Sequence, residues 1–438
     1  MPTKLRLAPF TVDITPPVGM PLAYGFNRKT DAPIHLRGVV FDDGAARVVL
    51  CAAEIIGLYG KAYAERRGVV ARAAGVPPGN VLFHSVHQHD SLRPPSRGVR
   101  AMLRRRKLLA PGEDAYWDEL LKKIDAAIRA AVRPGARGAW RKVEALATAE
   151  RRVAGLASNR RLVGPDGKVQ AMRWSMTTDP KLQAWPVGRI DPLLRTIGFL
   201  GAGGRPLATL HFYATHPMGA YGRNMVSADI PGVALAHLRR AHPGGQHVYF
   251  TGCAGNITFG KYTTPSKERN LKLLGARLGE ALAANVRALE LREAGPLRLK
   301  RARFELPLDT QRCTLAKLRT AIADAADRHK ACHEAMRLEA LQGFLKRPWT
   351  PLTRLDLGPR VHVLSLPAET VVEYQLYAQA RAPERFLAAA AYGDGSLQYI
   401  PTAAMYAEGG YEPTVSLLTP EVERCYHAAL DRLLNDLP

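Results

Sequence analysis

The sequence is poor in cysteine and has no long hydrophobic run. Its five cysteines are odd in number and show neither paired spacing nor a metal-type repeat, which favours reduced, mostly buried thiols over a disulfide framework. Nowhere do 18 apolar residues follow one another, and no apolar h-region opens the chain. The sequence therefore predicts neither a membrane-spanning helix nor a secretion signal, and we expect a soluble cytoplasmic protein.

Acidic residues are scarce relative to basic ones. The chain has 39 Asp and Glu against 62 Lys and Arg, a net charge of +23, and such a charge attracts polyanions or anionic membrane surfaces. Residues 97–107 hold the densest basic cluster. It is either a solvated face or a lid that meets an anionic substrate or lipid headgroup. No aromatic-interleaved basic motif or zinc-finger spacing accompanies the charge, which argues against nucleic-acid binding.

The sequence also lacks internal repeats and low-complexity linkers, which predicts one compact domain over residues 1–438. Successive helix, turn and apolar strand patterns predict an α/β fold of mixed β-sheets flanked by helices. Strands are expected at residues 39–41, 48–51, 81–83, 194–200, 207–214, 248–251, 297–308, 360–366 and 386–392. Helices are expected at residues 62–74, 116–132, 231–242, 267–289, 314–345 and 420–434.

Three histidines, His84, His87 and His89, follow the apolar strand at residues 81–83. His87 and His89 are two residues apart. In extended backbone this spacing puts both rings on one face, roughly 6.5 Å apart along the strand. The pair can share a metal ion or divide the roles of ligand and proton donor. The alternative is that they are hydrogen-bonded core histidines without a catalytic role.

Other candidate residues lie at the ends of later strands. His216 follows the strand at residues 207–214, and Glu369 falls in the first turn of a helix expected to start at Pro367, where the helix dipole favours a carboxylate. His329 and His333 have the i, i+4 spacing of a zinc-binding helix. Because a lysine follows His329 instead of the glutamate of zinc proteases, we expect this second pair on a solvated face.

Six motifs in one order resemble the catalytic domain of the neutral (non-lysosomal) ceramidase family. They cover about residues 8 to 415 and read Val12-Asp13-Ile14-Thr15-Pro16-Pro17-Val18-Gly19, His87-Gln88-His89, Ala214-Thr215-His216-Pro217 with Ser227-Ala228-Asp229, Gly252-Cys253-Ala254-Gly255-Asn256-Ile257-Thr258, Pro367-Ala368-Glu369, and Tyr399-Ile400-Pro401-Thr402 with Tyr411-Glu412. The resemblance implies the ceramidase catalytic-domain fold. The chain stops too soon after the last motif to hold the C-terminal immunoglobulin-like domain of true ceramidases.

The resemblance also implies a site. His87, His216, Glu369 and Tyr399 fall on the positions that hold one zinc ion, and His89, Arg160 and Tyr411 fall near the scissile amide. Two imidazoles, a carboxylate and a phenolic oxygen suit Zn²⁺, which activates water and polarises carbonyls. Thr258 stands where ceramidases carry a serine that is sometimes called the nucleophile. We expect metal-activated water as the attacking group, with a covalent Thr258 as the alternative.

The chain departs from the family mainly near the substrate. His-Gln-His-Asp at residues 87–90 replaces His-Thr-His-Ser-Gly-Pro and alters the pocket wall beside the metal. We predict a zinc-dependent amidohydrolase, connected with lipid or sphingolipid metabolism, that cleaves a linear N-acyl amide, either ceramide-like or smaller. The alternatives are a zinc esterase or phosphoesterase and a non-catalytic protein that binds anionic lipid or nucleic acid. An anionic membrane surface that binds residues 97–107 is a further expected partner.

Overall fold

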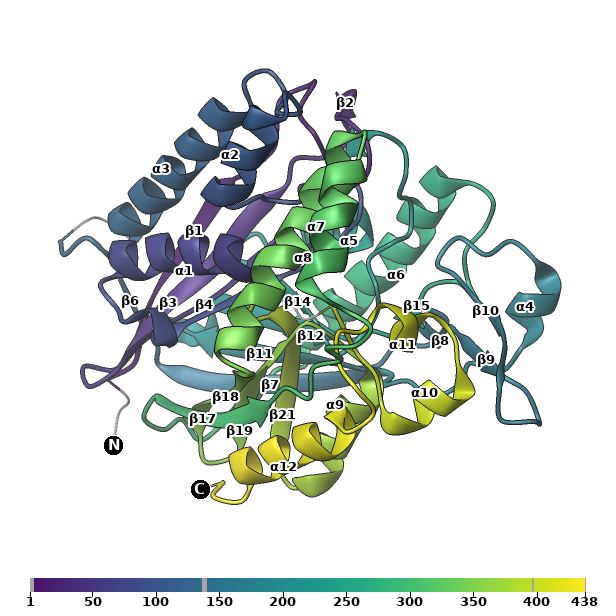
Figure 1. Cartoon of the computed structure of the whole chain (residues 1–438). Helices are drawn as coiled ribbons and strands as arrows, with labels where there is room; N and C mark the ends of the chain where they lie inside the picture. Colours follow the sequence, from purple (N-terminus) through teal and green to yellow (C-terminus); the bar gives the residue numbers. More distant parts are fainter. Residues whose placement is uncertain (1–3, 136–139, 396–397, 438) are drawn as a thin grey trace.

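The computed structural model describes residues 4–135, 140–395 and 398–437. Within these residues, the chain forms two large sheets flanked by helices (Figure 1). The larger, mixed sheet has the order β17 (Arg298–Glu305), β18 (Trp349–Gly358), β19 (Val361–Pro367), β21 (Phe386–Gly393), β5 (Val81–Ser85), β4 (Arg47–Ala53), β3 (His35–Asp42), β1 (Arg6–Asp13), β6 (Arg141–Lys142). The smaller sheet has the order β14 (Gln246–Thr251), β12 (Pro206–Tyr213), β11 (Leu193–Leu200), β7 (Ala145–Arg152), β16 (Glu290–Arg292). The predicted fold class is confirmed.

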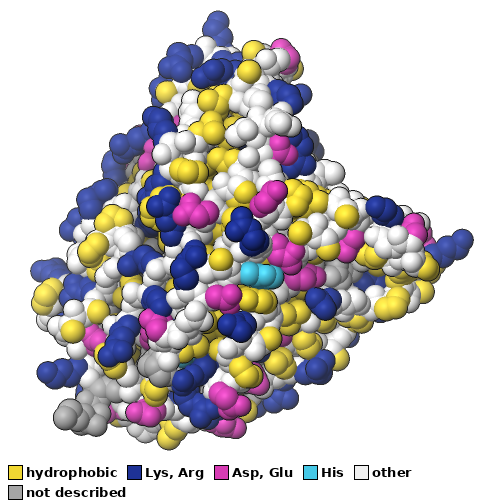
Figure 2. Space-filling view, turned by 60° about the horizontal axis from the view of Figure 1, so that its bottom comes forward, with side chains coloured by type: hydrophobic (Ala, Val, Ile, Leu, Met, Phe, Trp, Pro, Cys, Tyr) yellow, Lys and Arg dark blue, Asp and Glu magenta, His cyan; other side chains and the backbone are white. Residues whose placement is uncertain are grey.

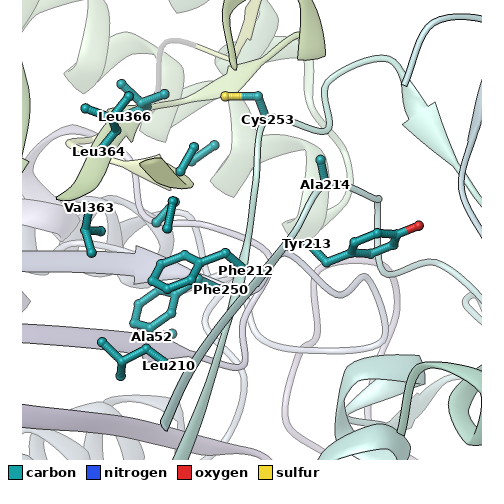
Figure 3. Close-up of a cluster of buried hydrophobic side chains, with 14 of the residues drawn as sticks. Ala52, Leu210, Phe212, Tyr213, Ala214, Phe250, Cys253, Val363, Leu364 and Leu366 are labelled. Atoms are coloured by element: carbon teal, nitrogen blue, oxygen red, sulfur yellow. The ribbon is translucent and has the colours of Figure 1, made fainter. Parts of the chain in front are cut away.

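The two sheets pack face to face, and the main core lies between them. Phe41 of β3 contacts Phe199 of β11, with 4.7 Å between ring centroids, and Phe212 stacks on Phe250 at 5.0 Å. Figure 3 shows this core, where Leu210 and Phe250 of the smaller sheet face Ala52 of the larger one. The central strands, such as β4, β5 and β12, are buried on both faces, which explains why the sequence reads there as apolar runs instead of clean alternation.

Helices cover the outer face of each sheet. The larger sheet packs against α1 (Gly60–Ala74) and α3 (Glu113–Val132), and the smaller sheet packs against α5 (Asp229–Ala241) and α6 (Lys267–Arg287) (Figure 1). Further helices are α2 (Arg97–Arg105), α7 (Leu315–Asp324), α8 (Arg328–Lys346), α9 (Val372–Arg381), α10 (Ala403–Glu408), α11 (Tyr411–Val415) and α12 (Val422–Leu434). In the part of the chain that the structure describes, no helix combines the length and apolarity needed to cross a membrane.

Parallel strand pairs determine where the site lies. β4 pairs in parallel with β5, β12 with β14, and β19 with β21. The carboxyl ends of parallel strands meet at one edge, where α/β proteins bind their ligands. The segments that follow β5, β12, β14 and β19 carry four of the six motifs, and they converge at this edge.

Candidate metal centre

His87 and His89 lie in the loop after β5, not in the strand. β5 ends at Ser85, and His87 has a left-handed backbone, with φ 76°. The expectation of an extended pair on one strand face is therefore wrong. After Ser85 the chain turns to follow residues 53–55, because the amides of Val86 and His87 donate hydrogen bonds to the carbonyls of Ala53 and Ile55. The turn still leaves the two histidine rings 5.1 Å apart between centroids.

His216 is fixed by the loop that follows β14. Its amide donates to the carbonyl of Ile257 at 3.0 Å, and its Nδ1 lies 2.5 Å from the carbonyl oxygen of Ala254. Asp229 supports the segment after His216, because its carboxylate accepts a hydrogen bond from the Gly219 amide at 2.9 Å. The glycine-flanked loop at residues 252–260 and the Ser-Ala-Asp motif therefore have a structural role in holding this histidine.

Glu369 does not start a helix. It belongs to the short strand β20 (Glu369–Thr370), which pairs in parallel with β22 (Tyr399–Ile400), and α9 begins only at Val372. The expected first-turn position was wrong for a physical reason. Ala368 adopts φ 57°, and Gly255 donates its amide to the Thr370 carbonyl, so the segment stays extended beside the glycine loop. A Cβ on Gly255 would lie 2.5 Å from the carbonyl oxygen of Glu369, so only glycine fits here.

These segments bring four side chains together. The Glu369 Oε2 atom lies 3.1 Å from His87 Nε2 and 3.2 Å from His216 Nε2. The Tyr399 hydroxyl oxygen lies 3.4 Å from His216 Nε2. His89 completes a three-histidine group with His87 and His216, whose ligand atoms all lie within 4.8 Å of one another. This three-histidine group could hold a metal ion.

Backbone carbonyls orient the rings of the two inner histidines, His87 and His216. His87 Nδ1 lies 2.5 Å from the Ile56 carbonyl oxygen, and His216 Nδ1 is placed likewise against Ala254. A carbonyl only accepts, so each Nδ1 carries the hydrogen and each Nε2 of a neutral ring presents a lone pair. Burial lowers the pKa of His216 to about 4, so this ring is neutral at pH 7. The Nε2 atoms of both rings face the Glu369 carboxylate at close range.

Glu369 is ionised at neutral pH. Burial acts to raise its pKa, but the adjacent imidazoles of His87 and His216 hold the pKa well below its usual value. The buried Nε2 atom of His89 has no hydrogen-bond partner among the described residues, whereas that of His87 lies 3.1 Å from Glu369 Oε2. Positive charge stabilises a carboxylate that lies among imidazole nitrogens, and either a protonated ring or a cation bound between them supplies it. The arrangement therefore fits a divalent metal.

The distances fit a tetrahedral metal site. With metal–ligand bonds of about 2.0 to 2.1 Å, the ligand atoms of a tetrahedral zinc site are roughly 3.3 Å apart. The observed separations of 3.1, 3.2 and 3.4 Å match this edge length. These three separations all involve Glu369 Oε2 or His216 Nε2. His89 lies beside the same group, with its ring centroid 5.1 Å from that of His87 and 6.2 Å from that of His216.

Arg160 and Tyr411 lie beside Tyr399. The Arg160 guanidinium is within 5.3 Å of the ring centroids of Trp174, Tyr399 and Tyr411. Its Nε donates to Glu412 at 2.7 Å, while its buried Nη2 has no hydrogen-bond partner among the described residues. Burial raises the pKa of Tyr411 to about 12, so this half-exposed phenol keeps its proton at neutral pH.

Thr258 is engaged by the backbone. It lies in β15 (Ile257–Thr258), its hydroxyl donates to the Arg173 carbonyl at 3.1 Å, and the same oxygen accepts from the Gly260 amide at 3.2 Å. The side chain is completely buried. These contacts give the hydroxyl a structural role, and they do not bring it to the metal group.

A cavity of about 420 Å³ opens onto the metal group, and its walls include His87, Glu369, Tyr399 and Tyr411. His333 of α8 also lines it, so the expected solvated face for the His329 and His333 pair is wrong. Both rings are half-buried, and His329 Nε2 lies 2.6 Å from the Gly25 carbonyl oxygen. The contact of α8 with this site had no signal in the sequence, because it joins segments some 240 residues apart. A larger cavity, of about 870 Å³, lies elsewhere and includes none of the four ligands.

The basic segment at residues 97–107 has both internal and exposed side chains, since Arg100 is buried while Arg97, Arg104, Arg105 and Lys107 are exposed. Arg100 pairs with Asp114 and Asp118 of α3 at 2.7 Å, and Arg106 donates to carbonyl groups of residues 322–325. On the face in Figure 2, Lys and Arg side chains are scattered with Asp and Glu among them. Binding of a membrane surface or of nucleic acid stays a prediction that these contacts do not test.

Comparison with known proteins supports the fold. No protein-family model and no curated protein matches the sequence. Two solved structures match the whole chain. Neutral ceramidase from Pseudomonas aeruginosa aligns with a TM-score of 0.70 and 17% identity, over 100% of this chain and 75% of that one. A ceramidase complexed with C2 aligns with a TM-score of 0.69 and 17% identity, over 100% and 76%. The expected resemblance is thus confirmed for the fold, and the chain is ceramidase-like in its architecture.

Proposed function

We propose that the protein is a zinc-dependent hydrolase of linear N-acyl amides, with ceramide-like or smaller substrates. The observation that carries this proposal is the convergence of the His87 and His216 Nε2 lone pairs on the Glu369 carboxylate at tetrahedral-edge distances. The cavity that reaches this group gives a substrate access to it. The ceramidase fold supports amide hydrolysis over other reactions.

His87, His216, Glu369 and Tyr399 would hold the ion. Bound Zn²⁺ supplies Lewis acidity, which activates water at neutral pH and polarises a carbonyl. The protein keeps the two imidazoles in the tautomer that a metal needs, since the Ile56 and Ala254 carbonyls accept from their Nδ1 atoms. Such tautomer control is a common feature of metal-binding histidines.

The neighbouring side chains would handle protons and developing charge. Burial lowers the pKa of His89 well below its usual value, so the ring is neutral. It can accept a proton from the attacking water and deliver it to the amide nitrogen as the C–N bond breaks. Tyr411 and Arg160 are hydrogen-bond donors that keep their protons, and they would stabilise the oxyanion. Water is the nucleophile in this scheme, since the Thr258 hydroxyl already bonds to the backbone.

The test combines metal content with activity. The purified protein should carry one zinc ion per chain and cleave members of a panel of N-acyl amides faster than the matched esters, which separates an amidase from an esterase. His87→Ala and His216→Ala should lose both metal and activity, whereas His427→Ala, on α12 against Tyr377, should lose neither. A metal-free protein whose His87→Ala variant is equally stable and active would overturn the proposal.

A further inference from the structure

The cavity above the metal group carries positive charge that the proposed ligands do not use. Besides ligands and tyrosines, its lining includes two cationic side chains, Arg93 and Arg337, and the neutral ring of His333, while Ile56 and Val415 are its aliphatic members. A pocket for a long acyl chain or sphingoid base needs mainly apolar walls. The lining therefore favours a substrate that brings a charged group into the cavity.

Arg93 is the unusual member of this set. It is only 9% exposed, yet among the described residues no acid or carbonyl pairs with it, and its Nε is buried without a hydrogen-bond partner. Its guanidinium carbon lies 5.2 Å from the ring centroid of Tyr24. Arg337 differs, because its Nη1 donates to Glu334 at 2.9 Å. A buried and uncompensated charge is costly unless a partner arrives with the ligand.

The segment that carries Arg93 is fixed on both sides. The Ser91 carbonyl accepts from the Ala23 amide at 2.7 Å, and the Leu92 carbonyl accepts from Ile56. The Pro95 carbonyl accepts from Arg66 Nη2 at 3.0 Å. The backbone around Arg93 is thus fixed before a ligand binds, and the guanidinium itself contacts the Tyr24 ring. Such ordering reduces the entropy cost of recognition.

Arg93 is also close to the reacting end of the site. Tyr24 contacts both the Arg93 guanidinium and the His89 ring, whose centroid is 5.4 Å away in a stacked arrangement. The proximity of Arg93 and Arg337 also contributes to the lowered pKa of His333, after burial. The field in this part of the cavity is therefore positive. An anion bound there would lie a short distance from an amide at the metal.

We propose that Arg93 binds an anionic group of the substrate, a carboxylate or a phosphate, so that the protein selects acidic N-acyl compounds such as N-acyl amino acids over neutral ceramides. The guanidinium fork matches both kinds of anion. This inference rests on the proposed amide hydrolysis for the position of the scissile bond. The anion site itself depends only on Arg93 and the cavity.

The experiment compares three amides of the same acyl chain on the full protein with its metal: N-hexanoylglycine, N-hexanoyl aminomethylphosphonate and neutral N-hexanoylethanolamine. Arg93→Met should lower kcat/KM for the acidic amides relative to the neutral one by about 10- to 100-fold, as for loss of a charge-assisted hydrogen bond. The loss should appear in KM. Arg93→Lys should recover part of it, and Arg287→Met, on the exposed end of α6, should change neither KM nor kcat for any of the three amides. The carboxylate and phosphonate arms tell which anion is preferred.

A binding measurement separates this inference from the proposed function. Calorimetry measures the affinity for ketone analogues of the three amides, in which a CH₂ group replaces the amide nitrogen so that the protein cannot hydrolyse them. If no amide is cleaved but the acidic ketones bind in an Arg93-dependent way, the hydrolase proposal fails and the anion site stands. If amides are cleaved and Arg93→Met affects acidic and neutral substrates equally, the anion site is wrong and the hydrolase stands. If Arg93→Met does not fold, Arg93→Lys replaces it in the comparison, because lysine keeps the charge but loses the bidentate geometry of the guanidinium. Arg93→Lys should then still weaken the acidic substrates more than the neutral one, and an equal effect on both would overturn the anion site.

Discussion

Glu369 and Tyr399 are register partners in a parallel pair of two-residue strands, β20 and β22. Since successive side chains of a strand point to opposite faces, partners in register place their side chains on the same face. This pairing directs the carboxylate and the phenol toward His216. His216 follows β12 of the smaller sheet, whereas Glu369 follows β19 of the larger one. The metal group is thus assembled across the interface of the two sheets.

The first prediction concerns the Glu369 carboxylate. At a free zinc concentration of 100 times the Kd, binding should stabilise the wild-type protein by about 2.7 kcal/mol. Glu369→Gln should lose this gain. Its amide can instead donate to the imidazole lone pairs, so the metal-free variant should be at least as stable as metal-free wild type. Thermal melts with zinc or with chelator measure both effects.

Glu373→Gln is the matched control, since Glu373 is a half-buried acid that accepts hydrogen bonds from Asn256 and lies outside the metal group. It should keep the full zinc shift. Equal zinc shifts in Glu369→Gln and wild type would contradict the ligand assignment.

Much of the fold could be predicted from the sequence because its elements carry strong local patterns. The helix at Trp117, Leu120, Ile124 and Ile128 and the hairpin around Asp43 follow from periodicity and turn chemistry. The histidines after β5 and β12 stood out because each follows an apolar run. The ordered motifs then indicated Glu369 and Tyr399, and the structure brings both to His216.

The parts of the fold and of the site that the sequence did not predict depend on tertiary contacts, and no local sequence pattern indicates such contacts. Ala368 reads as the start of a helix, but packing against the glycine loop imposes a left-handed backbone. Arg93 stands in a Pro-rich loop, and His333 and Arg337 belong to an ordinary polar helix. They become cavity residues only because α8 packs near the histidine loop. Residue type and spacing cannot report such contacts.

The second prediction uses the backbone strain at Ala368. With φ 57°, an L-residue there costs roughly 1 to 2 kcal/mol, which glycine avoids. Glycine in turn raises the entropy of the unfolded chain, so Ala368→Gly should stabilise the protein by a net of about 0.5 to 1 kcal/mol. Urea unfolding should show a higher midpoint with an unchanged slope.

Ala130→Gly on the exposed face of α3 is the control with the opposite sign. It should cost about 1 kcal/mol, the helix-propensity difference between alanine and glycine. A destabilised Ala368→Gly would mean that the alanine methyl group contributes more through packing than the backbone strain costs.

The third prediction is a pH dependence from His84. Burial lowers its pKa to about 4, although Nδ1 contacts the Ala391 carbonyl oxygen at 2.8 Å. A histidine in the unfolded chain has a pKa near 6.5, so between these values the unfolded state binds more protons. Stability should therefore fall as pH drops from about 6.5 to about 4, by up to about 1.4 kcal/mol per pH unit for this group. Below pH 4 this group adds no further loss.

Urea titrations between pH 7 and pH 4.5, with chelator present, measure this dependence. His84→Gln removes one titrating group and should show a shallower slope by about one proton. The same slope in both proteins would mean that His84 binds a proton in the folded state.

The last prediction decides between water and Thr258 as the nucleophile. Thr258→Val keeps the shape of the side chain but removes the hydroxyl that bonds to Arg173 and Gly260. Loss of these bonds should cost about 1 to 3 kcal/mol of stability. With water as the nucleophile, kcat of the folded variant should fall less than about 10-fold, whereas loss of a covalent nucleophile costs about 10⁶-fold in a serine protease.

Thr258→Ser separates hydroxyl chemistry from methyl packing, since it keeps the hydroxyl and removes only the buried methyl group. Both variants are assayed for kcat below their unfolding transitions, and the wild type is quenched during turnover for mass spectrometry. The expected result is no acyl adduct on Thr258 and near-wild-type kcat in both variants. An adduct of acyl mass on Thr258 would establish the covalent route. So would a folded but inactive Thr258→Val together with an active Thr258→Ser, because the hydroxyl would then be essential and the methyl group dispensable.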